Sequence, residues 1–83
     1  MTFDSLASQH RKKLLNMAFK MTKNWDEAAD LVQEALIRGY RGFGLYRGEA
    51  SFTSWMYHVM FRCYLDAGRA SRRRVRLVSM NGI

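Results

Sequence analysis

Apolar side chains recur every three or four residues along the first part of the chain, which is the period of one helical face. These positions are Phe3, Leu6, Ala7, Leu14, Met17, Ala18 and Met21. His10 falls in step with them, and we interpret it as a further residue of the same helix face. The pattern predicts a first helix over residues 3–22.

A second helix is predicted to begin at Asn24, because Asn24 and Glu27 have the spacing of a capping box and acidic side chains stabilise the start of a helix. Its inward face comprises Ala28, Leu31, Val32, Ala35, Leu36, Gly39 and Phe43. Its opposite face comprises Asp26, Asp30, Gln33, Glu34, Ile37 and Arg41. We therefore expect an exposed face that is rich in carboxylates.

Glycines at positions 39, 42, 44 and 48 predict the end of this helix and a connector, because glycine disfavours helix interiors and tolerates turn conformations. Ser51 or Thr53 can cap a third helix, which continues into an arginine-rich tail. Its apolar positions are Phe52, Met56, Val59, Cys63 and Ala67. Beyond residue 74 the periodicity fades.

We therefore expect an all-α domain over residues 1–74, a small bundle of three main helices plus a connecting loop or short helix. Residues 75–83 are expected to be the start of an inter-domain linker, with the rest of the protein absent from this chain. The lone Cys63 cannot form an internal disulfide and no zinc-like spacing occurs, so we expect a reducing compartment, no metal and no cofactor. The uncharged stretches are too short to span a bilayer, which predicts a soluble protein.

The formal net charge is +7, from 14 basic and 7 acidic residues, and it favours a polyanionic partner. Residues 1–24 contain five basic residues and one acidic residue, whereas residues 25–37 contain four acidic residues and no basic one. Residues 62–83 contain six arginines and one aspartate. This segregation predicts two kinds of surface, one acidic and one basic.

The acidic cluster of Asp26, Glu27, Asp30 and Glu34 allows more than one interpretation. Catalysis is disfavoured, because the cluster has no histidine partner and no nucleophile. A solvated helix face and a docking face for a basic partner helix remain open alternatives.

Aromatic, hydroxyl and basic side chains alternate between Tyr46 and His58, and single-strand binders build stacking platforms from these side chains. Phe52 shares a face with Met56 and Val59, which favours a place in the core. Off that face lie Tyr57, His58, Phe61 and Arg62. For these four, ligand contact and ordinary exposure both remain open. The arginines that follow suit phosphate contact, and nucleic acid is favoured over a membrane surface.

Two segments, residues 24–35 and residues 46–57, resemble parts of region 2 of bacterial sigma factors of the sigma-70 family, especially the extracytoplasmic-function group. Residues 24–35 resemble the segment with an Asp-Leu-x-Gln-Glu core, here Asp30-Leu-Val-Gln-Glu34. Residues 46–57, with the sequence Tyr-Arg-Gly-Glu-Ala-Ser-Phe-Thr-Ser-Trp-Met-Tyr, resemble the promoter-binding segment that follows it. Asp66, Arg69 and an arginine cluster come next, so the resemblance covers nearly the whole chain.

The resemblance implies a non-enzymatic factor for transcription initiation in the bacterial cytoplasm, at the nucleoid. Its expected partners are core RNA polymerase, promoter DNA and an anti-sigma factor. The resemblance further implies that Asp30, Gln33 and Glu34, with Ile37 beside them, contact the clamp helices of the polymerase β′ subunit.

The third helix and the loop before it are implied to hold the non-template strand of the minus-ten element, with one base flipped out of the stack. The loop residues expected to shape the base pocket are Tyr46, Arg47, Ser51 and Phe52. The residues expected to face the strand are Trp55, His58, Phe61 and Arg62. Those expected to hold phosphates are Arg69, Arg72 and Arg73.

The chain departs from the family pattern within the third helix. The sequence His58-Val-Met-Phe-Arg62 stands where the group commonly has Arg-Ile-Ala-Arg-Asn, so the base contacts of that Arg and Asn cannot be transferred. The paired tryptophans of primary sigma factors are replaced by His58 and Val59, as expected for a narrower promoter range. Two further hypotheses are a module held by an anti-sigma regulator and a basic module that binds nucleic acid or anionic membranes without specificity.

Overall fold

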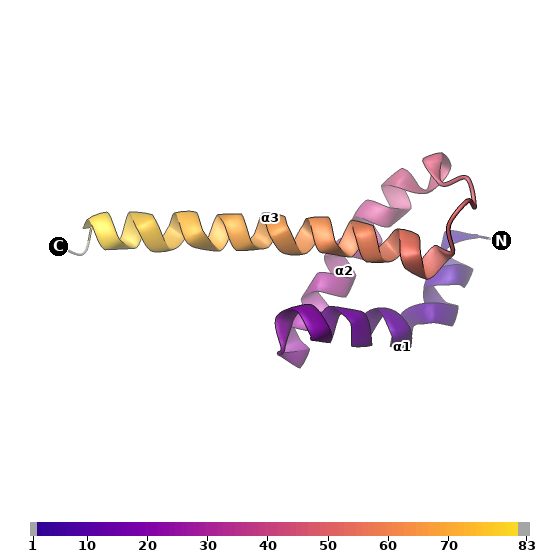
Figure 1. The fold of residues 1–83 in the computed structure, drawn as a ribbon, viewed down its shortest axis with the longest axis horizontal. Helices are drawn as coiled ribbons and strands as arrows, with labels where there is room; N and C mark the ends of the chain where they lie inside the picture. Colours follow the sequence, from indigo (N-terminus) through magenta and orange to yellow (C-terminus); the bar gives the residue numbers. More distant parts are fainter. Residues whose placement is uncertain (1, 82–83) are drawn as a thin grey trace.

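The computed structural model describes the backbone of residues 2–81 and the side chains of residues 2–68. Three α-helices and one short 3-10 helix follow one another in this part of the chain: α1 (Phe3–Thr22), α2 (Trp25–Gly42), η1 (Phe43–Leu45) and α3 (Phe52–Asn81). In Figure 1, α1 and α3 run from right to left while α2 passes behind them, and each helix packs on the other two. The predicted fold class and the predicted first helix are confirmed.

A turn of two residues joins α1 to α2. Lys23 ends α1 in the left-handed conformation, with a φ of 59°, and its N–H donates to the Phe19 carbonyl oxygen at 2.7 Å. Asn24 caps α2 as predicted, because its Oδ1 accepts a hydrogen bond from the Glu27 N–H at 3.0 Å. The Asn24 N–H donates to Thr22 Oγ1 at 3.4 Å, in the place that a Glu27 side chain takes in a full capping box. Local hydrogen bonds thus fix the direction in which α2 leaves α1.

The core lies where the three helices meet. Its buried apolar residues are Phe3, Leu14, Ala18, Ala28, Leu31, Val32, Ala35, Phe52, Met56, Met60 and Cys63. Met60 is fully buried although the sequence pattern did not place it on the inward face, whereas Ala67, which the pattern did place there, is exposed. Helical spacing alone therefore did not decide which apolar side chains of α3 are buried.

Phe3, at the start of α1, connects the end of α2 to the start of α3. Its ring makes edge-to-face contacts with Tyr40, Phe43 and Phe52, at centroid separations of 5.8, 5.4 and 5.7 Å. Aromatic pairs of this kind contribute about 0.5–1.5 kcal/mol each beyond their burial. Phe3 therefore packs the end of α2 against the start of α3, the two segments that the connector joins.

Helix α3 has 30 residues and continues through Asn81, so its C-terminal part extends beyond the bundle in Figure 1. The division between domain and linker at residue 74 stays a prediction. Within the described part of the chain, no helix is both long and apolar enough to cross a membrane.

Candidate interaction surfaces

The first candidate surface is the acidic face of α2, which we define as Asp30, Gln33, Glu34 and Ile37. All four residues are exposed, and they share one side of the helix because their spacing is three or four residues. The opposite side of α2 is buried in the core, which holds this face outward. A row of carboxylate and amide oxygens on a rigid helix can accept charge-assisted hydrogen bonds from a basic partner.

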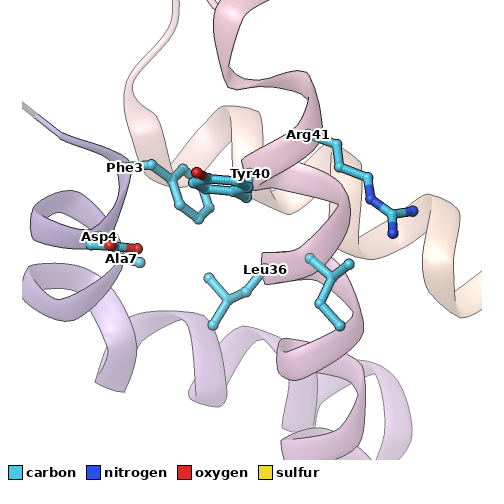
Figure 2. Close-up of a pocket in the computed structure, with 7 residues that line it drawn as sticks. Phe3, Asp4, Ala7, Leu36, Tyr40 and Arg41 are labelled. Carbon is cyan, nitrogen blue, oxygen red and sulfur yellow. The ribbon is translucent and has the colours of Figure 1, made fainter.

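A groove runs between the start of α1 and the second half of α2, beside the acidic face (Figure 2). Its volume is about 290 Å³. The residues that line it are Phe3, Asp4 and Ala7 on the α1 side and Leu36, Ile37, Tyr40 and Arg41 on the α2 side. Of these residues, only Ile37 was expected to lie on an interaction surface. The groove itself depends on how α1 and α2 cross, for which the sequence pattern carries no signal.

The second candidate surface begins at the connector, where residues 46–50 form a closed loop. The Tyr46 hydroxyl donates a hydrogen bond to the Ala50 carbonyl oxygen across the loop. Gly48 turns the chain with a φ of 76°, a conformation that glycine adopts without strain. Arg47 lies exposed within this turn. The structure therefore brings the predicted loop residues Tyr46 and Arg47 into one compact turn beside α3.

Ser51, Phe52 and Trp55 join the loop to α3 in different ways. Ser51 caps the helix, since its Oγ accepts a hydrogen bond from the Ser54 N–H at 3.2 Å. Phe52 is only 5% exposed, which places it in the core as its shared face with Met56 predicted. Trp55 is half-buried, and its ring centroid lies 5.0 Å from that of Tyr46. Direct contact between Phe52 and DNA stays a prediction.

Aromatic side chains continue along the outward side of α3. Tyr57, Phe61 and Tyr64 are exposed, and the rings of Tyr57 and Phe61 stack with centroids 6.3 Å apart. His58 and Arg62 are exposed beside them. Tyr64 was not among the predicted site residues, although its spacing of three residues from Phe61 indicates the same side of the helix. Exposed aromatic faces next to a cation can stack with unpaired bases.

The arginine-rich end of α3 was predicted to hold phosphates. The side chains of Arg69, Arg72 and Arg73 lie outside the described residues, so this role stays a prediction. Arg62 lies two helical turns before that segment and is exposed.

An ion pair connects the helices that carry the two surfaces. Arg38 Nη1 on α2 donates to Asp66 Oδ2 on α3 at 2.8 Å. This hydrogen bond raises the pKa of Arg38 above its usual value. Nearby, burial raises the pKa of the Cys63 thiol, while the Arg38 charge acts in the opposite direction. Cys63 is thus held as a neutral thiol in the core, as its place on the apolar face predicted.

Comparisons with known proteins agree with the resemblance. The family model described as sigma-70 region 2 matches residues 6–74. The chain is 35% identical over 57 residues to the RNA polymerase sigma-H factor of Pseudomonas aeruginosa, covering 69% of this chain and 30% of that protein. It is 31% identical over 72 residues to the ECF RNA polymerase sigma factor SigG of Mycobacterium tuberculosis, covering 87% of this chain and 20% of that protein.

A third relative, the RNA polymerase sigma factor YlaC of Bacillus subtilis, is 25% identical over 65 residues, which cover 78% of this chain and 38% of that protein. These matches span only about a fifth to two fifths of the length of the relatives. No solved structure matches the chain. Because the family model covers most of the sequence and relatives above 30% identity support it, the chain belongs to the sigma-70 region 2 family, among the ECF sigma factors.

Proposed function

We propose that this domain binds the clamp helices of the RNA polymerase β′ subunit through the acidic face of α2. We also propose that it holds the non-template strand of the minus-ten element through the connector and α3. The observation that carries the proposal is the separation of the two exposed surfaces, with acidic and amide side chains on α2 and aromatic and basic side chains on α3. Each surface has the chemistry of one of the two partners.

The polymerase contact is supported by the rigidity of α2 and by charge. A basic partner helix placed along this face would meet Asp30 and Glu34 one turn apart, with Gln33 between them. The helix already places the three side chains on one side, so binding orders little new backbone. The clamp helices are the partner that the family membership suggests.

The DNA contact is supported by the aromatic surface that runs from Tyr46 and Trp55 to Phe61. Unstacking a promoter base costs a few kcal/mol, and stacking on aromatic side chains contributes about 1–3 kcal/mol per base. Capture of unpaired bases can therefore offset the cost of melting without any catalytic group. In this proposal His58 and Arg62 face the strand, and Arg47 and the arginines after residue 68 contact phosphates.

Ser51 and Phe52 would influence the base pocket indirectly. The Ser51 hydroxyl is engaged at the start of α3 and the Phe52 ring is buried, so both would shape the pocket by fixing the loop and the helix start. We extend the proposal to an anti-sigma regulator that covers the acidic face, since one partner bound there would exclude the other.

The test is a fluorescence-anisotropy titration of labelled single-stranded DNA with the domain, at two salt concentrations, with and without bacterial core RNA polymerase. Strand-selective binding that strengthens with polymerase is expected. The Glu34→Gln variant should lower affinity for polymerase by about tenfold. Glu49→Gln makes the same charge change at an exposed position of the connector, away from α2, and it should change that affinity by less than about twofold.

For the DNA side, Arg62→Gln should weaken strand binding and reduce its salt dependence by about one counterion. Arg11→Gln, an exposed arginine on α1, is the matched control. Binding that is equal for all strands, driven wholly by salt and unaffected by polymerase would overturn the proposal in favour of a basic module without specificity.

A further inference from the structure

The groove beside the acidic face exposes two large apolar side chains on its α2 side. Ile37 is 48% exposed and Tyr40 is 65% exposed, and both line the groove. Scattered exposed apolar residues are normal on a protein surface, but these two stand together at a concave site that Ala7 and Leu36 also line. Burial of such a site stabilises a complex in proportion to the apolar area removed from water.

The size of the groove limits what can occupy it. A volume of about 290 Å³ is at the lower end of the range for small-molecule pockets, about 300–1,000 Å³. One or two apolar side chains of a partner fit this space. Insertion of such anchors from an amphipathic helix is a common mode of recognition.

The position of the groove relates it to the acidic face. Ile37 belongs to both the acidic face and the groove, and it follows Glu34 by three residues, about 4.5 Å along the axis of α2. A partner helix that lies along α2 and pairs with Asp30 and Glu34 would therefore reach the groove with its next turn. A single partner helix would therefore contact both the acidic face and the groove.

The charge around the groove favours the same partner. Asp4 is exposed at the α1 side of the groove and Arg41 lines its α2 side, so the negative charge that favours a basic partner comes from Asp30 and Glu34 of the adjoining acidic face. Figure 2 shows the Arg41 side chain extending away from Phe3 and Tyr40. The fitting occupant is a helix with basic residues on one edge and an aliphatic or aromatic residue at the adjoining position.

Resting on the proposed polymerase contact, we infer that the polymerase helix bound by the acidic face also inserts an apolar side chain into this groove. The docking surface then extends from α2 to the first turns of α1. The acidic residues supply orientation and Phe3, Ala7 and Tyr40 supply the apolar anchor site.

The first test fills the groove without removing any charge. Ala7→Leu places a larger side chain in the groove and should lower affinity for bacterial core RNA polymerase by about tenfold, as the loss of a buried anchor does. Gln9→Leu adds an apolar side chain at an exposed position of α1 outside the groove and should leave the affinity within about twofold. Thermal unfolding of each variant checks that the fold is kept.

A second variant covers the case in which Ala7→Leu unfolds the domain. Tyr40→Ser removes one flank of the groove at a mostly exposed position, and it should weaken polymerase binding by about fivefold or more. Wild-type affinity in both groove variants, together with weak binding of Glu34→Gln, overturns the groove and leaves the proposed function standing. Wild-type affinity in all three variants overturns both. If sedimentation shows a dimer that Ala7→Leu dissociates, the groove takes a second copy of the chain and the inference is wrong.

Discussion

Gly39 on α2 lies directly against Met56 on α3. A Cβ atom at residue 39 would stand 2.8 Å from the Met56 sulfur and 3.2 Å from the Phe3 ring. The absence of a side chain at this position lets the backbone of α2 approach α3 closely at the centre of the bundle. This contact therefore helps to set the angle between the acidic face of α2 and the exposed aromatic side of α3.

Gly39→Ala should destabilise the domain. Alanine gains up to about 1 kcal/mol in helix propensity, but its Cβ would force the fully buried Met56 side chain to shift, and overpacking costs about 1–3 kcal/mol. We expect a net loss of about 1 kcal/mol in the free energy of unfolding by urea. Gly68→Ala on α3 has open space around its Cβ, so it should gain about 0.5–1 kcal/mol. Equal effects of the two changes would contradict this packing argument.

Tyr46→Phe should loosen the loop of residues 46–50 while keeping the aromatic contact with Trp55. The change removes only the hydroxyl that bonds to the Ala50 carbonyl oxygen, a hydrogen bond worth about 0.5–1.5 kcal/mol. Trypsin should then cleave after Arg47 several-fold faster, while the free energy of unfolding falls by no more than the contribution of this one hydrogen bond. Tyr64→Phe on α3 is the control. If cleavage after Arg47 is as slow in Tyr46→Phe as in the wild type, the hydroxyl does not hold the loop.

The Arg38–Asp66 ion pair should contribute a small, salt-sensitive coupling between α2 and α3. Its side chains are 41% and 46% exposed, and exposed pairs contribute about 0.2–1 kcal/mol. A double-mutant cycle with Arg38→Ala and Asp66→Ala, measured by urea unfolding, should give a coupling in this range at low salt. The coupling should diminish at about 1 M salt, where the screening length falls to about 3 Å. A coupling that does not change with salt would contradict an electrostatic origin.

Because of Cys63, the free energy of unfolding should decrease as the pH rises into the alkaline range. Burial raises the pKa of this thiol in the folded protein. Above about pH 8.5 the unfolded thiol loses its proton while the folded thiol keeps it, so the unfolded state binds fewer protons and is favoured as pH rises. Unfolding curves under reducing conditions, from neutral pH to about pH 10, should show a smaller decline for Cys63→Ala. Parallel pH curves for the two proteins would exclude this contribution.

Much of the fold was predictable because its signals are local. The period of apolar residues gave the bounds of α1, and the spacing of Asn24 and Glu27 located the start of α2. The exposed side of α2 followed from the same period, which is why Asp30 and Glu34 were expected on one surface. The roles of these residues in binding stay predictions, because a pattern of exposure does not identify the partner.

What the sequence pattern missed depends on how helices cross. The burial of Met60 and the exposure of Ala67 depend on where α3 meets and then passes the other two helices. Arg38 and Asp66 meet although 28 residues separate them, and no helical period links two positions on different helices. The groove at Tyr40 was missed for the same reason, since its flanks belong to α1 and α2.

Met56 and Met60, whose side chains are fully buried, stand at the centre of this small core. A buried thioether is shielded from peroxide, whereas conversion to the sulfoxide would put a polar oxygen among apolar neighbours. Oxidation at these two positions therefore requires the bundle to open first. The rate at which the two sulfoxides form under mild peroxide then reports how often the domain unfolds, and each oxidised molecule should have difficulty folding again.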